Sequence, residues 1–96
     1  MVIRFEWNPA KARSNLRKHG IDFATASRVF DDPLHLSVQD RFDDKTGEAR
    51  WITFGLVDES MIVAVAHTVR EGDHEVIRII SARRATKQER QRYEQS

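Results

Sequence analysis

The chain contains no cysteine, little net charge and no long apolar segment. Without cysteine it can form no disulfide, no thiolate metal site and no cysteine nucleophile. The 16 Lys and Arg residues nearly balance the 15 Asp and Glu residues, so the net charge of +1 does not by itself indicate a nucleic-acid-binding protein. No signal peptide or membrane-spanning stretch is recognisable, so the cytoplasm is the expected compartment and no membrane partner is expected.

The composition is otherwise that of an ordinary globular protein, with 40% hydrophobic and 32% charged residues. Ninety-six residues can build one modest hydrophobic core and not two, so residues 1–96 are expected to form a single domain. The histidines follow no spacing typical of metal ligands, and neither a metal nor another cofactor is expected; they are His19, His35, His67 and His74.

The first third of the chain predicts a short strand over residues 4–7 and then two helices. Asn8 is a good N-cap, Pro9 suits the first helical position and Gly20 is a typical C-terminal stop. A second helix should begin after Asp22 and end at Pro33. The two helices are expected to form a hairpin hinged at Gly20.

From residue 34 onward the apolar residues recur with a period of two, which is typical of strands. A strand is expected at 34–39, a polar loop at 40–49, and three antiparallel strands at 50–57, 61–69 and 75–82. Thr86 and Glu89 form a capping box that opens a last helix. The predicted fold is therefore α+β, with an N-terminal helical hairpin packed on an antiparallel β-sheet meander and a C-terminal helix.

The strand pattern also predicts which side chains face one another, provided that the register is right. If Val57 lies opposite Met61, Trp51 pairs with His67, and the alternate, apolar face that carries Ile52 and Phe54 is the one that the early helices cover. If Val69 pairs with His74, His67 lies diagonal to Arg78. Trp51, His67 and Arg78 would then converge on one face.

The segment SARR ends the most apolar predicted strand and leads into a basic helix. Arg78 interrupts the apolar run VIRII, where an unpaired charge is costly to desolvate, so it should have an anionic partner. That partner is either RNA phosphate or an intramolecular carboxylate such as Glu48 or Asp40. Arg83 and Arg84 precede a helix N-terminus, which suits phosphate binding, and a solvated run of charge is the alternative for both.

Three further residues are candidates for acid–base or binding roles. His67 ends a long apolar strand and titrates near neutral pH, so it is a candidate acid or base, with a structural histidine as the alternative. Glu48 is a second candidate base, although loop carboxylates are usually just solvated. Lys18 lies at the C-terminal end of the first predicted helix, where its interaction with the helix dipole is a sufficient explanation without any function.

Trp51 and Tyr93 can each either stack on an unpaired RNA base or belong to the core. Arginines, a histidine and aromatic residues on a small sheet fit RNA cleavage without a metal. In that chemistry a base activates the ribose 2′-OH, arginines stabilise the phosphate in the transition state, and an acid protonates the leaving 5′-oxygen. A non-catalytic module that binds nucleic acid or an acidic partner with the same basic face is the alternative.

The order of these motifs resembles the BrnT family, toxins of type II toxin–antitoxin modules. The resemblance covers nearly the whole chain and rests on FEWNPAKARSNLRKHGIDFATASRVFDDP, GEARWITFG, VAHT and IRIISARRATKQERQRYE. One departure is Asn8, where the family usually carries Asp before the proline. Both residues cap helices, so little functional change is expected.

The resemblance implies a RelE-like, ribonuclease-type α+β fold and metal-independent endonucleolytic cleavage of RNA that arrests translation. It also implies a cognate BrnA-like antitoxin that masks the toxin, a toxin dimer within a heterotetrameric complex, and binding of that complex to operator DNA through the antitoxin. The expected catalytic residues are His67, Arg78, Arg83 and Glu48. The expected RNA-binding residues are Arg84, Lys18, Trp51 and Tyr93.

Overall fold

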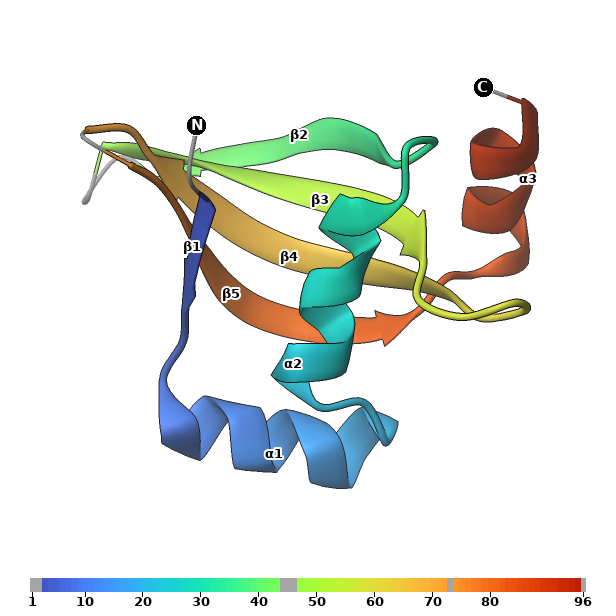
Figure 1. Ribbon diagram of the computed structural model, residues 1–96, viewed down its shortest axis with the longest axis horizontal. Helices are drawn as coiled ribbons and strands as arrows, with labels where there is room; N and C mark the ends of the chain where they lie inside the picture. The colour runs from blue at the N-terminus through green and yellow to red at the C-terminus, as the bar shows by residue number, and fades with distance from the viewer. Residues whose placement is uncertain (1–2, 44–46, 73, 96) are drawn as a thin grey trace.

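The computed structural model describes residues 3–43, 47–72 and 74–95. Its elements are β1 (Ile3–Glu6), α1 (Pro9–His19), α2 (Phe23–Ala26), the 3-10 helix η1 (Ser27–Asp31), β2 (Leu36–Asp43), β3 (Glu48–Leu56), β4 (Ile62–Arg70), β5 (Glu75–Arg84) and α3 (Lys87–Gln95). The five strands form one sheet in the order β1-β5-β4-β3-β2. Figure 1 shows α2 in front of the sheet, α1 below β5 and α3 beyond the end of β5.

The α+β class, the three-strand meander and the C-terminal helix are confirmed, but the description of the N-terminus as a helical hairpin on an antiparallel sheet is wrong. The chain begins with β1, which pairs parallel with β5, so the sheet is mixed. A parallel partner distant in sequence leaves no local pattern, and the predicted short strand at 4–7 could not be assigned to an edge. The predicted second helix is also broken, since α2 passes into η1 after Ala26.

The predicted helix ends are confirmed at α1 and α3. The Asn8 side chain accepts hydrogen bonds from the backbone N–H groups of Ala10 and Lys11, and Gly20 closes α1 with φ of 71°. At α3, Thr86 and Glu89 exchange side chain-to-backbone hydrogen bonds of 2.8 and 3.2 Å, as a capping box requires. These caps fix where both helices begin.

The prediction of a polar loop over residues 40–49 is also wrong in part. The strand β2 continues to Asp43 and β3 already begins at Glu48, so much of this segment is paired strand with a bulge between Gln39 and Arg41. Residues 44–46 of the predicted loop, and residue 73 of the next turn, lie outside the described residues. The polar composition reflects an edge strand that is exposed to water rather than an absence of strand.

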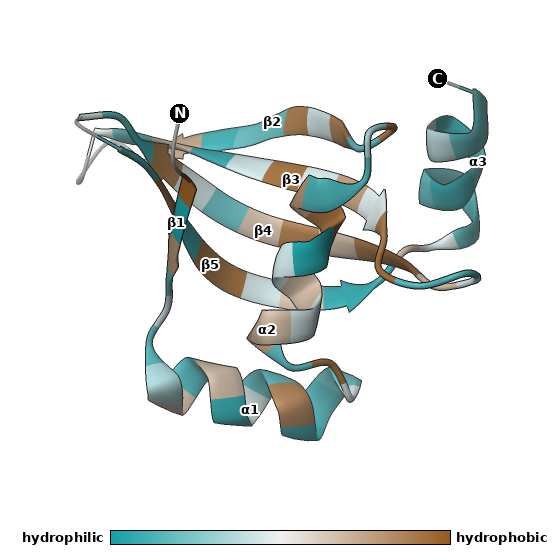
Figure 2. Cartoon of the chain, in the orientation of Figure 1, coloured by the Kyte–Doolittle hydropathy of each residue, from teal (hydrophilic) through white to brown (hydrophobic). Residues whose placement is uncertain are grey.

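Two hydrophobic clusters lie on opposite faces of the sheet. One contains residues of α2, η1, β4 and β5, among them Phe23, Val29 and Val65. The other contains Phe54 and Tyr93, so α3 covers the face that carries Ile52 and Phe54. The predicted assignment of the early helices to that face is therefore wrong; they cover the opposite face. Figure 2 shows hydrophobic segments in the central strands and an almost wholly hydrophilic α3, which contributes little more than Tyr93 to its cluster.

A glycine explains how the early helices reach the sheet. A Cβ added at Gly55 would lie 2.8 Å from the carbonyl oxygen of Val29, nearer than side chains tolerate. The backbone of η1 therefore presses directly on β3. On the same side, Asn15 of α1 is buried and bonds both the N–H and the C=O of Ala82, at 3.0 and 2.8 Å. Its side chain replaces a neighbouring strand at this part of the edge of β5.

Candidate nucleic-acid interface

The observed register separates residues that the sequence analysis placed together. The predicted pairing of Trp51 with His67 is confirmed. Val69, however, pairs with Ile77 rather than His74, and His67 pairs with Ile79. A shift by three positions, an odd number, moves Arg78 to the opposite face of the sheet. The predicted convergence of Trp51, His67 and Arg78 is therefore wrong.

The structure instead gathers arginines on the face opposite to α1 and α2. Directly paired residues share a face, and the pairs Arg4–Val76, Val76–Arg70, Arg78–Thr68, Thr68–Arg50, Arg50–Arg41 and Arg83–Ala64 run across the sheet. We call this surface the arginine face; it comprises Arg4, Arg41, Arg50, Arg70, Arg78 and Arg83. A near-neutral chain thus carries a strongly basic surface, which is the electrostatic footprint of a nucleic-acid-binding protein.

The carboxylate of Glu6 lies among these arginines. Glu6, paired with Arg78 in register, places Oε1 at 2.7 Å from Nη1 of Arg70 and 3.7 Å from Nη1 of Arg78. The intramolecular partner of Arg78 is thus Glu6 rather than the expected Glu48 or Asp40. The side chain of Arg78 is 44% exposed, so it does not suffer the desolvation that its apolar neighbours suggested. Sequence reasoning missed Glu6 because the pairing of β1 with β5 was not predicted.

Arg83 and Arg84 point to different places although they are adjacent. Arg83 makes a bidentate ion pair with Glu89 of α3, at 2.7 and 3.0 Å. The hydrogen bond from Arg83 lowers the pKa of Glu89, and the same bond raises the pKa of Arg83. Arg84 is exposed and pairs with Val63. Val63 lies on the face of the sheet that packs against α2 and η1, which we call the helix-covered face. The run is therefore not uniformly solvated charge, since Arg83 anchors α3 at the border of the arginine face.

Arg50 and Glu48 occupy the other end of the arginine face. Nε of Arg50 is buried and has no hydrogen-bond partner among the residues described. Glu48 is half-buried and precedes Arg50 by two residues in β3, so the two side chains emerge on the same face. This end of the face therefore combines a second carboxylate with a guanidinium whose Nε has no acceptor in the described part of the chain.

His67 and Trp51 line a different cavity, on the helix-covered face. The pocket has a volume of about 370 Å³ and is lined mainly by apolar side chains, including Phe30 and Ile77. His67 is only 3% exposed, and its Nε2 lies 2.7 Å from Oγ1 of Thr53. Burial lowers the pKa of His67 to about 4, despite an opposing effect of the Thr68 backbone. His67 is therefore neutral at physiological pH.

Tyr93 and Lys18 are also kept apart from the centre of the arginine face. Tyr93 is 7% exposed, and its hydroxyl donates a hydrogen bond to Asp32. Burial, and then the Asp32 carboxylate, raises the pKa of Tyr93 to about 12. Lys18 lines a shallow pocket of about 230 Å³ with Lys11 and Ser81, at the edge of β5.

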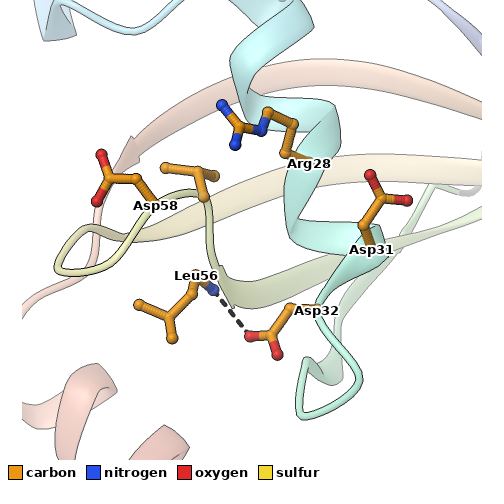
Figure 3. A pocket seen from close by; sticks show the side chains of 6 residues that line it. Arg28, Asp31, Asp32, Leu56 and Asp58 are labelled. Carbon is orange, nitrogen blue, oxygen red and sulfur yellow. Dashed lines mark hydrogen bonds between the residues drawn. The ribbon is translucent and has the colours of Figure 1, made fainter.

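Figure 3 shows a third pocket, lined by Arg28 and Asp31 of η1, Asp58 of the β3–β4 turn, and Asp32. Burial would raise the pKa of Asp32, but hydrogen bonds from the Leu56 N–H, the Tyr93 hydroxyl and the Leu34 N–H hold it below its usual value. Asp32 therefore ties η1 to β3 and α3, and this pocket is a structural junction.

The part of the chain that the structure describes offers neither a metal site nor a membrane-spanning helix. No group of three or more His, Cys, Asp or Glu side chains is arranged to hold a metal ion within residues 3–43, 47–72 and 74–95. None of the helices in these ranges has the length and apolar character needed to span a bilayer.

The fold matches that of a known protein. The crystal structure of the Brucella abortus ribonuclease toxin BrnT superimposes with a TM-score of 0.66 and 22% sequence identity, covering 91% of this chain and 100% of that chain. The family model for the ribonuclease toxin BrnT of type II toxin–antitoxin systems matches residues 7–89. The chain belongs to this family, which implies ribonuclease activity, an RNA substrate and a cognate antitoxin. A search of curated proteins finds no match.

Proposed function

We propose that this protein is a metal-independent endoribonuclease that binds RNA on the arginine face and thereby inhibits translation. The observation that carries the proposal is the concentration of six arginines, together with Glu6 and Glu48, on one side of the sheet. Guanidinium groups bind phosphate bidentately and stabilise the charge that develops during phosphoryl transfer. Carboxylates on the same surface can serve as proton acceptors.

The basic residues named as candidates divide into two proposed roles. Arg78 lies in the centre of the face beside Glu6, and Arg83 lies at its border with α3, so both are candidates to clamp the scissile phosphate. Arg84 and Lys18 lie at the periphery, on the strand end and the edge of β5, which suits contacts to flanking phosphates. Peripheral contacts contribute affinity, whereas clamps contribute mainly to the transition state.

The proposed proton-transfer group is a carboxylate of the arginine face rather than His67. Glu48 and Glu6 share that face with Arg78, whereas His67 is buried on the opposite one. Of the two aromatic candidates, Trp51 lines an open pocket and has room for a stacked base, while Tyr93 is enclosed by its cluster. Trp51 is therefore the proposed stacking residue only for a base that reaches beyond the arginine face, since its pocket lies on the opposite face.

The proposed binding site of the antitoxin is the same surface. We propose that a BrnA-like antitoxin masks the arginine face with acidic residues, within a heterotetrameric complex that contains a toxin dimer and binds operator DNA through the antitoxin. Family membership supports the partner, and the charge of the arginine face supports the choice of surface.

The test is cleavage of a single-stranded RNA, and of the same sequence as DNA, by purified antitoxin-free protein in EDTA. We expect cleavage of the RNA alone, together with inhibition of a cell-free translation reaction. The double variant Arg41→Gln/Arg50→Gln should lose both RNA binding and cleavage. Arg13→Gln/Arg17→Gln removes the same charge from exposed positions on α1 and should behave like the wild type.

Two outcomes would contradict the proposal. Salt-sensitive RNA binding without cleavage would support the non-catalytic module instead. Equal losses in the two double variants would show that total charge, rather than the arginine face, determines activity.

A further inference from the structure

The first strand contributes a charged residue whose place in the reaction follows from geometry. We infer that Glu6 is the general base that activates the ribose 2′-OH, and this inference rests on the proposed ribonuclease function. Glu6 lies in β1 at the edge of the sheet and reaches the arginine face only because β1 pairs in parallel with β5.

The position of the base is constrained by the substrate. In metal-independent cleavage the 2′-oxygen attacks the phosphorus bound to the neighbouring 3′-oxygen of the same ribose. The group that takes the 2′ proton must therefore lie within one nucleotide of the arginine that holds the phosphate. Oε1 of Glu6 lies 3.7 Å from Nη1 of Arg78, the central proposed clamp, so a phosphate bound by Arg78 brings its 2′-OH to Glu6.

A second contact orients this carboxylate. Nη1 of Arg70 donates a 2.7 Å hydrogen bond to Oε1 of Glu6. Because both arginine contacts use Oε1, Oε2 is the oxygen that takes the proton. Arg70 is thus a positioning residue, and the three side chains come from the three neighbouring strands β1, β4 and β5.

The step balances without any co-reactant besides water. The 2′-OH proton moves to Glu6 while the 2′-oxygen bonds to phosphorus, and the bond from phosphorus to the 5′-oxygen breaks. The leaving 5′-oxygen takes a proton from solvent, and Glu6 later returns its own proton to solvent. The products carry a 2′,3′-cyclic phosphate and a 5′-hydroxyl.

Glu48 is the competing candidate on the same face. It lies at the start of β3, and its neighbour along that strand is Arg50, whereas Arg78 is two strands away in β5. A base at Glu48 would therefore need the scissile phosphate to bind at Arg50. Glu6 is therefore the expected base if Arg78 holds the scissile phosphate, and Glu48 is the expected base if Arg50 holds it.

The alternative is that Glu6 has no catalytic role and forms only a surface ion pair. Its side chain is 36% exposed and that of Arg70 is 52% exposed, and such pairs contribute little to stability. Glu6→Gln should therefore fold normally, which makes the functional readout interpretable.

The experiment compares wild type, Glu6→Gln, Glu6→Asp and Glu48→Gln on a mixed-sequence single-stranded RNA in EDTA, with product ends mapped. We expect Glu6→Gln to lower kcat at least roughly 100-fold with KM nearly unchanged, and to abolish the fall in rate at acidic pH that a carboxylate base imposes. Glu6→Asp should recover part of the rate, and Glu48→Gln should lower kcat much less than Glu6→Gln does.

The outcomes separate this inference from the proposed function. A wild-type rate in Glu6→Gln, a change confined to KM, or a large loss of kcat in Glu48→Gln alone would overturn the role of Glu6 while leaving the ribonuclease intact. Product ends other than a cyclic phosphate would overturn the proposed step. Wild-type protein that cleaves no RNA would overturn the proposed function and the inference with it.

Discussion

The two faces of the sheet are built from the same strands, yet they place titratable groups in opposite environments. On the helix-covered face His67 is 3% exposed and its pKa is lowered to about 4 by burial. On the arginine face the side chains of Arg70 and Arg78 are 52% and 44% exposed and share a carboxylate. The helices that cover His67 keep it neutral and out of reach of RNA, whereas the arginines of the other face stay exposed and available to bind it.

The largest expected effect is on the arginine face. Arg78→Ala should lower the rate of RNA cleavage roughly 10²–10³-fold while changing RNA affinity much less, since a clamp acts mainly on the transition state. Single-turnover rates and equilibrium binding measure the two quantities separately. Unfolding by urea should be close to wild type because Arg78 is largely exposed. An affinity loss equal to that of Arg84→Ala would abolish the distinction between clamp and periphery.

On the helix-covered face, the largest expected effect of a substitution is a loss of folding stability. Asn15→Ala removes the partners of the Ala82 N–H, the Ala82 C=O and the Ile21 C=O, all of which are buried with it. Because unsatisfied buried groups are costly, the free energy of unfolding should fall by about 4 kcal/mol. Urea denaturation checks this value. Ser14→Ala, its neighbour on α1, is the control and should cost far less.

The helix caps and the β3–β4 pairing could be predicted from the sequence. Local signals were reliable: Asn8, Gly20 and the Thr86–Glu89 box cap the helices as predicted. The tight β3–β4 connection fixed the pairing of Trp51 with His67 correctly, since a short turn leaves few registers.

The site itself depended on long-range information. The β4–β5 register contains a bulge between Ala66 and His67 and differs by three residues from the prediction, which placed Arg78 on the wrong face. Glu6 was missed for a related reason, since the parallel pairing of β1 with β5 leaves no mark in the local sequence. The residue types were recognisable from sequence, whereas their grouping required the sheet.

A smaller stability effect should depend on pH. His67 is neutral in the folded protein down to about pH 4 but takes a proton near pH 6.5 when unfolded. The unfolded state therefore binds more protons in this window, so stability should fall by about 3 kcal/mol as pH drops from 6.5 to 4. The carboxyl groups whose pKa is lowered also reduce stability as pH falls toward their unfolded values of 3.8 to 4.5, at the acidic end of this window; they are Asp22, Asp32, Asp58 and Glu89.

The matched variants isolate that contribution. Urea denaturation at several pH values should show a shallower pH dependence for His67→Gln than for wild type. His74→Gln changes an exposed histidine and should follow the wild-type curve. If His67→Gln retains the full pH dependence, the burial of His67 on the helix-covered face is not its cause.

The smallest effect is expected outside the arginine face, at the end and the edge of β5. Arg84→Ala and Lys18→Ala should each weaken RNA binding less than tenfold and reduce the slope of log affinity against log salt by about 0.7, because each removes about one phosphate contact. Cleavage of bound RNA should remain near the wild-type rate. Titrations at several salt concentrations measure the slope, and Lys87→Ala, an exposed residue of α3, controls for the loss of one positive charge. If the slope is unchanged in Arg84→Ala and Lys18→Ala, RNA does not extend beyond the arginine face, and the interface ends at the pairs that Arg78 and Arg83 make.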